Sequence, residues 1–392
     1  MSQLPDNVSA VLPSAETNRR RLRRVRSQHR PKDPASLDEL IVEGSWAQTT
    51  GPNPQPFLPY DNDSQTAKRL LIFSTTENLQ LLAQSESLFM DGTFGVAPSM
   101  FAQLYVIHGQ VGVMQCPLVY ALMERQTQSS YEELFRFIID QCDAAPMNIS
   151  VDFEQAAHHA ICSVFGDNVT LRGCFYHLTQ STWRKIQNLG LSELYKTDDT
   201  FRLFCGQLDA LALLPLASVY AGMAYLRGIM PAAAEELVDY FDATYVSGSL
   251  RRCPLRRTGS QLRDTGLRLR LTRRRPIFSP TVWNCHETTL NDDARTNNVC
   301  EGWNNSVARL VGHDHPSIWK LIETLQSDVA RVHVLVLQES RGMRPGKRVR
   351  RNTEELQKRL KNLCNDLVSD RKDIPAFLRG VSHNIRFGQI YV

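Results

Sequence analysis

An alternation of strand-like and helix-like segments in the first half of the chain constrains the fold most strongly. Three apolar runs, at residues 88–94, 101–108 and 117–123, have Gly, Pro or Gln at their joints, which is typical of strands. Two more strands are expected at residues 147–151 and 169–173, each between amphipathic helices. Three consecutive strands followed by alternating helices and strands predict an α/β fold with a mixed sheet flanked by helices.

The helices between these strands are predicted from apolar residues that recur at helical spacing. The first helix should begin at a capping box formed by Ser130 and Glu133. Two further helices are expected at residues 153–165 and about 175–189. These segments complete the predicted strand and helix order of the first half.

The second half of the chain reads differently. Residues 191–247 are expected to be wholly helical, with a hinge at Pro215, and the arginine-rich residues 248–280 to be irregular. Residues 295–311 predict another helix, and a long helix should start near Pro316, where proline suits a first turn.

We therefore divide the chain into five parts. In chain order these are a basic helix and linker at 1–64, the first part of the α/β core at 65–190, a helical insertion with an arginine-rich loop at 191–280, the final core helices at 281–338, and a basic C-terminal tail or helix at 339–392.

Cysteine usage and hydropathy bear on the compartment. The nine cysteines include no CxxC pair, which argues against a disulfide framework and favours a reducing compartment, the cytosol or nucleus. No signal peptide is visible. Residues 210–226 carry no charge, but proline and glycine interrupt them, so we expect two buried helical pieces and no membrane partner.

Basic residues are concentrated in short segments. Of the net charge of +4, residues 19–32 contribute +8 and residues 249–276 contribute +9, which leaves −13 on the remainder. Residues 341–351 form a third basic cluster. Basic clusters on an acidic body indicate an anionic polymer such as nucleic acid as a partner. Solvated loops and a nuclear import signal are the alternative interpretation.

Two aspartates occupy matched places in the predicted sheet. Asp91 interrupts an apolar strand, where a carboxylate costs stability unless something neutralises it. Asp152 ends the fourth predicted strand, which can lie beside the first. Paired carboxylates repel one another unless a cation bridges them, and Mg²⁺ is bound by one or two carboxylates with water and phosphate. Ordinary turn aspartates are the alternative.

Glu301 and a CxxH pair are the remaining chemical candidates. On a helix, Glu301 should face away from a buried stripe of Val299, Trp303, Val307 and Leu310, among the amides of residues 297, 298, 304 and 305. An exposed glutamate on a polar face is the alternative. Cys174 and His177 lie at a strand-to-helix junction, where a structural cysteine and a hydrogen-bonded histidine are favoured over zinc.

Seven motifs, in order and at similar separations, resemble the catalytic domain of Mutator-like (MULE) DNA transposases over about residues 65–330. They are MDGTF, YVIHG, PLVYALME, SYEELF, VDFEQAA, GCFYHLTQSTWRKIQNLGL and RTNNVCEGWNN. The N-terminal NRRRLRRVRSQHRP also resembles the basic helix that often precedes this domain in animal members.

The resemblance implies a ribonuclease H-like fold with an all-helical insertion before the last catalytic helix. It implies a DDE triad in which Asp91, Asp152 and Glu301 are catalytic and hold two Mg²⁺ (or Mn²⁺) ions for strand cleavage and strand transfer on DNA. Cys174 and His177 match the family's CxxH motif, whose role is unsettled. Nuclear location, DNA as partner and a possible homo-oligomer follow from the same resemblance.

Basic and amide side chains are expected to bind DNA phosphates. They are Arg19, Arg20, Arg21, Arg23, Arg24, Arg251, Arg252, Arg273, Arg274, Arg275, Asn298 and Asn305.

The sequence also departs from the family pattern. Residues 1–64 contain His29 and no cysteine, so no FLYWCH-type zinc finger is evident. Asn304 stands where the family more often has histidine. Residues 248–276 are either a DNA-binding loop or the product of a faulty gene model. Two other functions therefore stay open: a domesticated, catalytically silent DNA-binding protein, and a scaffold for protein interactions.

Overall fold

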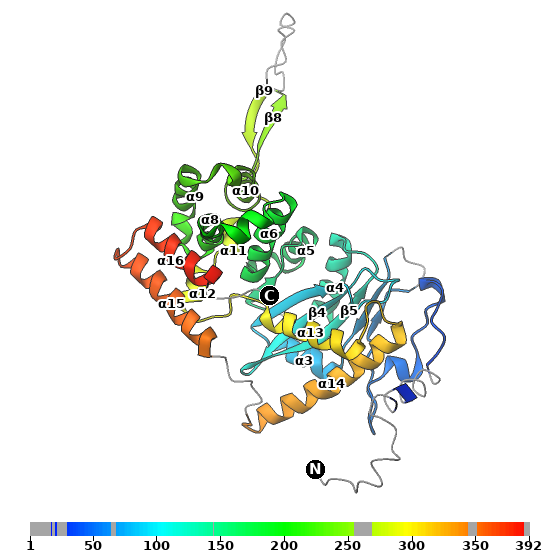
Figure 1. The fold of residues 1–392 in the computed structure, drawn as a ribbon. Helices are drawn as coiled ribbons and strands as arrows, with labels where there is room; N and C mark the ends of the chain where they lie inside the picture. Colours follow the sequence, from blue (N-terminus) through cyan, green and yellow to red (C-terminus); the bar gives the residue numbers. More distant parts are fainter. Residues whose placement is uncertain are drawn as a thin grey trace, which may run out of the picture.

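The chain forms two halves that meet at a shared boundary (Figure 1). The computed structural model describes residues 17, 20–21, 30–63, 68–143, 145–254, 269–343 and 351–387. We call residues 30–173 with 298–340 the sheet half, and residues 175–290 with 351–387 the helical half. Of the basic helix expected near the N-terminus, only Thr17, Arg20 and Arg21 are described, and these are helical.

The sheet half is built on seven strands in the order β1-β2-β5-β4-β3-β6-β7. Their bounds are β1 Tyr60–Asp61, β2 Leu70–Phe73, β3 Ser87–Thr93, β4 Gln103–Val111, β5 Met114–Met123, β6 Asn148–Val151 and β7 Thr170–Gly173. The pairs β1–β2, β2–β5, β5–β4 and β4–β3 are antiparallel, whereas β3–β6 and β6–β7 are parallel. The prediction of a mixed sheet flanked by helices is confirmed, and the arrangement is consistent with a ribonuclease H-like α/β fold.

The pairing of β3 with β6 positions the two aspartates. Phe89 lies opposite Ser150 in this parallel pair. Asp91 and Asp152 each follow these partners by two residues, so both reach the carboxyl end of the sheet at the same level. The expected proximity of the first and fourth predicted strands is thereby confirmed.

Helices cover both faces of the sheet. One face packs against α3 (Thr76–Ala83), α4 (Gln128–Cys142) and α5 (Gln155–Phe165). The other face packs against α13 (Asn298–Val311) and α14 (Ile318–Ser340). The apolar strands are buried on both faces, which explains why they read as continuous runs.

The start of α4 differs from the expected capping box. Thr127 is the N-cap, and its side chain accepts a hydrogen bond from the backbone N–H of Ser130. Ser130 therefore lies inside the first turn, and its predicted role as the cap is wrong. The preceding threonine satisfies the same orphan donor.

The helical half confirms the all-helical prediction for residues 191–247. Its helices are α6 Phe175–Asn188, α7 Ser192–Thr197, α8 Asp199–Ala210, α9 Val219–Ile229, α10 Glu235–Phe241, α11 Pro280–Trp283, α12 His286–Leu290, α15 Arg351–Val368 and α16 Ile374–Phe387. Pro215 separates α8 from α9, as expected. No helix among the described residues is both long and apolar enough to cross a membrane, and no described cysteine forms a disulfide.

Short turns complete the described elements. They are the 3₁₀ turns Leu37–Glu39, Gly44–Ala47, Gly166–Asn168, Leu211–Leu213, Leu216–Ser218 and Ala232–Ala234, and one π turn, Asp242–Val246.

The C-terminal helices are part of the helical core. Phe377 and Leu378 of α16 are fully buried in one apolar cluster with Phe201 and Leu208 of α8. A segment that is basic in sequence thus supplies apolar side chains to the insertion. The helical half is consequently assembled from segments that precede α13 and α14 in the chain and segments that follow them.

An antiparallel arm replaces part of the segment expected to be irregular. Strands β8 (Leu250–Pro254) and β9 (Leu269–Arg273) pair and project from the helical half, away from the sheet (Figure 1). Gly248 at the base has φ +79°, and an added Cβ would lie 1.9 Å from the carbonyl oxygen of Arg274. Only glycine fits this position, so the base of the arm has a defined shape.

Candidate active site

Three acidic residues from separate elements line one cavity of about 970 Å³. Asp91 lies within β3 and is 5% exposed, Asp152 directly follows β6, and Glu301 lies in the first turn of α13. The cavity is also lined by Tyr240 and Phe278 of the helical half, so it lies at the boundary between the halves. The sheet register and the placement of α13 thus bring the three predicted acids together.

The burial of α13 differs from the expected stripe. Val299 and Leu310 are 41% and 57% exposed, and the buried residues are Cys300, Trp303, Val307 and Val311. The indole N–H of Trp303 donates to Asp328 Oδ2 at 2.6 Å, which fixes the rotation of the helix. The expected burial of Trp303 and Val307 is confirmed, whereas the expected burial of Val299 and Leu310 is wrong by one residue, and Glu301 is half-buried at the cavity instead of exposed on a polar face.

Asn297 connects α13 to the two aspartate-bearing strands. This residue is fully buried, and its Nδ2 donates to the carbonyl oxygens of Met90 in β3 and Ser150 in β6, at 3.2 and 3.3 Å. Its Oδ1 accepts a 2.7 Å hydrogen bond from Ser150 Oγ. The expectation that Asn297 belongs to an exposed amide patch is wrong, because the side chain satisfies buried strand groups.

The other three amides of the predicted patch differ in their positions relative to the cavity. Asn304 Nδ2 donates to Asp91 Oδ2 at 2.8 Å. Asn305 is exposed and lines the cavity, whereas Asn298 is exposed and lies outside its lining. The asparagine that replaces the family's usual histidine therefore holds the Asp91 carboxylate.

Burial disfavours the ionised forms of the acids in the cavity. Burial raises the pKa of Asp91 to about 7, and the charges of Asp152 and Glu301 add to the increase. Burial likewise raises the pKa of Glu301 to about 7. Burial also raises the pKa of Asp152, against the opposing effects of the Glu154 N–H and the Arg184 charge. A bound cation would reverse these shifts by favouring the carboxylates.

Glu154 is a fourth acid of the cavity that sequence reasoning missed. Its Oε2 accepts a 2.6 Å hydrogen bond from Tyr131, whose hydroxyl accepts a 2.5 Å bond from Gln103 Nε2. Burial raises the pKa of Glu154 to about 7, and the Asp152 charge adds to it. The D-x-E spacing after the strand was the available signal, because both residues precede the same helix.

Two cations face these acids from α6. Arg184 and Lys185 line the cavity, and the Lys185 Nζ lies 5.3 Å from the centre of the Tyr240 ring. The sequence showed this pair inside a family motif but not its position beside the acids. Positive groups next to a carboxylate cluster are suited to a phosphate-bearing ligand.

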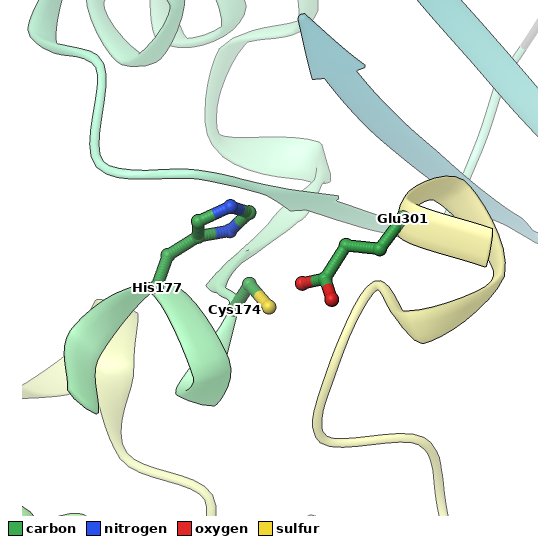
Figure 2. Close-up of side chains that lie close together, drawn as sticks. All are labelled: Cys174, His177 and Glu301. Carbon is green, nitrogen blue, oxygen red and sulfur yellow. The ribbon is translucent and has the colours of Figure 1, made fainter. Parts of the chain in front are cut away.

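The CxxH pair lies at the start of α6, across from Glu301 (Figure 2). Cys174 is the fully buried N-cap, and its Sγ accepts a hydrogen bond from the backbone N–H of Asn297 at 3.2 Å. Burial raises the pKa of the Cys174 thiol to about 11 and lowers the pKa of His177 to about 4. A buried cysteine is confirmed, but His177 Nδ1 has no hydrogen-bond partner among the described residues, contrary to expectation.

The acids also fit the predicted divalent ions. Within the described part of the chain, Asp152 Oδ1 and Glu301 Oε1 are buried without a hydrogen-bond partner. A buried acceptor without a partner is costly in free energy unless a ligand satisfies it. Carboxylate oxygens are the ligands preferred by Mg²⁺ and Mn²⁺, so the donor set is chemically appropriate.

Of the residues expected to contact DNA, those on the arm whose side chains the structure describes are exposed. Arg251, Arg273, Arg274 and Arg275 have exposed side chains at the arm and its base. Arg20 and Arg21 are also exposed. Arg252 lies in β8, and its side chain, like the whole of Arg19, Arg23 and Arg24, is outside the described part.

Comparison with known proteins supports the resemblance found in the sequence. Residues 87–181 match the family model of the MULE transposase domain. The match includes Asp91, Asp152, Cys174 and His177, whereas Glu301 and most of the helical half lie beyond it. No curated protein matches the chain. The predicted MULE resemblance is confirmed over this segment, which supports a transposase-related function.

Proposed function

We propose that the protein is a MULE-type transposase or a transposase-derived enzyme that cleaves and joins DNA strands by metal-dependent phosphoryl transfer. The observation that carries the proposal is the single cavity in which Asp91, Asp152 and Glu301 face one another from two strands and a helix. Their raised pKa values and the partnerless oxygens are those of a cation site. The match to the MULE domain supports the choice of DNA as substrate.

The three acids have different positions in the site. The charges of both Asp152 and Glu301 raise the pKa of Asp91, so Asp91 interacts with both of the other acids and is the one we propose to hold both ions. Asp152 and Glu301 would then hold one ion each. When bound, the ions supply the positive charge that activates an attacking hydroxyl and stabilises the leaving oxygen.

Hydrogen bonds prepare the acids for this task. Asn304 orients the Asp91 carboxylate by donating to Oδ2. Asn297 fixes the start of the helix that carries Glu301 against both strands. Such supporting contacts matter because they determine how firmly a metal ligand is held.

Basic groups would hold the DNA around these acids. Arg184 and Lys185 line the cavity, where they can pair with phosphates next to the reacting one. The exposed arginines of the arm extend the positive surface outward from the helical half. Binding through phosphates is salt-sensitive and carries little sequence information, so these residues would set affinity more than site choice.

Nicking of supercoiled DNA by the purified full chain, with Mg²⁺ or Mn²⁺, tests the proposal. We expect Asp152→Asn to slow nicking by at least about 100-fold, because it removes an ion ligand worth several kcal/mol. Asp140→Asn is the matched control, because this exposed aspartate of α4 does not line the cavity. Wild type that nicks no faster than Asp152→Asn, but still retains DNA in a salt-dependent way, would instead support the catalytically silent DNA-binding protein.

Action on chromosomal DNA further requires nuclear location, which we also propose on the basis of the basic N-terminal segment. Microscopy of the fluorescently tagged full chain tests it. Exclusion of the tagged protein from the nucleus would contradict this part of the proposal.

A further inference from the structure

Three side chains near the N-terminus of α6 form a cluster whose ligand chemistry differs from that of the purely carboxylate cluster of Asp91, Asp152 and Glu301. The Cys174 thiol, the His177 imidazole and the Glu301 carboxylate each offer a ligand atom, and these atoms all lie within 4.8 Å of one another. Figure 2 shows the three side chains directed toward a common space, two from the start of α6 and one from α13. Thiolate and imidazole are ligands that zinc prefers and that magnesium does not.

The spacing of the cluster is close to that of a zinc site. Zinc bonds of roughly 2.3 Å to sulfur and 2.0–2.2 Å to nitrogen and oxygen place tetrahedral ligand atoms roughly 3.5 Å apart. The upper limit of 4.8 Å in the cluster means that small side-chain rotations would bring all three atoms to a common centre. The His177 and Glu301 side chains are only partly buried, so they have room for such a rotation.

The surroundings also prepare each ligand. The Asn297 N–H donates to Cys174 Sγ at 3.2 Å, an interaction that stabilises a metal-bound thiolate. Asn297 is itself held by both central strands, so this donor is rigid. Among the described residues, His177 Nδ1 and Glu301 Oε1 are buried and have no hydrogen-bond partner, which leaves one atom of each side chain available to a metal.

We propose that Cys174, His177 and Glu301 bind one Zn²⁺ ion. The Cys174 thiol releases its proton to solvent as the sulfur–zinc bond forms, and no oxidation or reduction takes place. The fourth position of the zinc faces the cavity, because His177 and Glu301 both line it, so water or a DNA phosphate oxygen completes the tetrahedron.

The site has a regulatory consequence, which rests on the proposed function. Glu301 belongs both to the zinc cluster and to the acids proposed to hold Mg²⁺. Zinc bound at this cluster would withdraw Glu301 from the magnesium set. Zinc would therefore inhibit strand cleavage reversibly, and a chelator would restore it.

Cobalt titration of the metal-free full chain tests the binding site without any need for activity. Co²⁺ adopts zinc geometry, and a thiolate bound to it gives a charge-transfer band in the near ultraviolet. We expect a band that saturates at one equivalent and is abolished by added Zn²⁺. Absence of this band in the wild type would overturn the proposal.

Matched variants assign the band to these residues. Cys174→Ser should abolish the band. His177→Gln and Glu301→Gln should each lower the affinity for Co²⁺ by more than about 100-fold, because the loss of a ligand should exceed the largest loss usual for a residue that only supports one. Cys162→Ser and Asp91→Asn are the controls and should keep the band, since Cys162 is an exposed cysteine outside the cluster. A band that survives Cys174→Ser, or is lost in Cys162→Ser, contradicts the site. If Cys174→Ser does not fold, the contrast between His177→Gln and Asp91→Asn decides.

The nicking assay separates this proposal from the proposed function. With Mg²⁺ present, the nicking rate of each protein is compared with and without zinc. Zinc should slow the wild type strongly and His177→Gln far less, each relative to its own zinc-free rate. A cobalt band without nicking in any sample would leave the zinc site standing and contradict the enzyme. Nicking that zinc inhibits equally in both proteins would contradict the regulatory role.

Discussion

The two halves of the molecule bring opposite chemistry to their shared cavity. The sheet half supplies the carboxylates of Asp91, Asp152, Glu154 and Glu301, and the helical half supplies Arg184 and Lys185 with a wall of aromatic rings. Carboxylates suit metal ions, and cations suit phosphates. On the proposed function, metal binding and DNA holding would therefore be divided between residues of two separately packed cores, and mutations in one core should leave the contribution of the other intact.

The largest expected effect comes from removing the carboxylate of Glu301, which lies on α13 and not on the strands that position the aspartates. Glu301→Gln should slow metal-dependent nicking by about 1,000-fold, comparable with Asp91→Asn, because each removes an ion ligand. Glu236→Gln, an exposed glutamate of α10, is the control and should leave the nicking rate unchanged. A Glu301→Gln protein with wild-type rates would show that the sheet half acts through its strand acids alone.

A core substitution tests whether the halves are separate folding units. Phe377 is fully buried in the helical half, and Phe377→Ala should lower the free energy of unfolding of that half by about 3–5 kcal/mol. Scanning calorimetry should then show one transition shifted down and another unchanged. Phe94→Ala is the control, because Phe94 is 54% exposed. A single transition that shifts as a whole would mean that the halves unfold together.

The hydrogen bonds that tie α13 to the sheet give a smaller effect. Asn297→Ala should lower the free energy of unfolding by about 2–3 kcal/mol, because it leaves buried strand groups without partners. Asn298→Ala changes the exposed neighbour and should stay within about 0.5 kcal/mol. Chemical denaturation of the two variants measures this difference. Equal stabilities would show that the Asn297 bonds do not join the helix to the strands.

The two aspartates show what could be predicted from the sequence, and the two asparagines show what could not. Asp91 and Asp152 lie on or next to strands with clear local patterns, so the strands were predictable and their adjacency followed from the expected order of the sheet. Asn297 and Asn298 look alike in sequence, and the difference between them arises from hydrogen bonds with Met90 and Ser150, far away in the chain. Local pattern contains no information about such distant partners.

The helical half shows the same limit on a larger scale. Helix existence was predictable across residues 191–247 from composition and apolar spacing, and so was the break at Pro215. The docking of α16 on α8 was not, because its apolar face has no local sign of which surface it will cover. The paired arm was missed for a related reason: arginine-rich strands lack the apolar alternation by which strands are recognised.

The pH dependence of stability should come mainly from the sheet half. Burial lowers the pKa of His108 to about 3, below its ordinary value near 6.5, so the folded protein binds fewer protons than the unfolded chain between these values. The contribution of His108 to stability should therefore fall as the pH falls from about 6.5, by about 2 kcal/mol at pH 5, whereas the raised pKa values of Asp91, Glu154 and Glu301 act in the opposite direction. His108→Gln should remove this contribution, so the stability of the variant relative to wild type should rise as the pH falls below about 6.5 in denaturation curves, whereas His313→Gln, an exposed control, should keep the wild-type dependence. An unchanged slope in His108→Gln would assign the acid sensitivity to other groups.

The smallest effect is expected at the arm, where the helical half would bind DNA at a distance from the cavity. The pair Arg273→Ala with Arg274→Ala removes two exposed cations, so it should weaken DNA binding several-fold and lower the salt dependence of log K by about 1 for each phosphate that is no longer neutralised. Folding and the Mg²⁺ dependence of nicking should stay unchanged, because neither arginine lines the cavity. Fluorescence anisotropy at several salt concentrations measures the slope. An unaltered slope would remove Arg273 and Arg274 from the DNA surface and shift the phosphate contacts of the helical half toward Arg184 and Lys185 at the cavity.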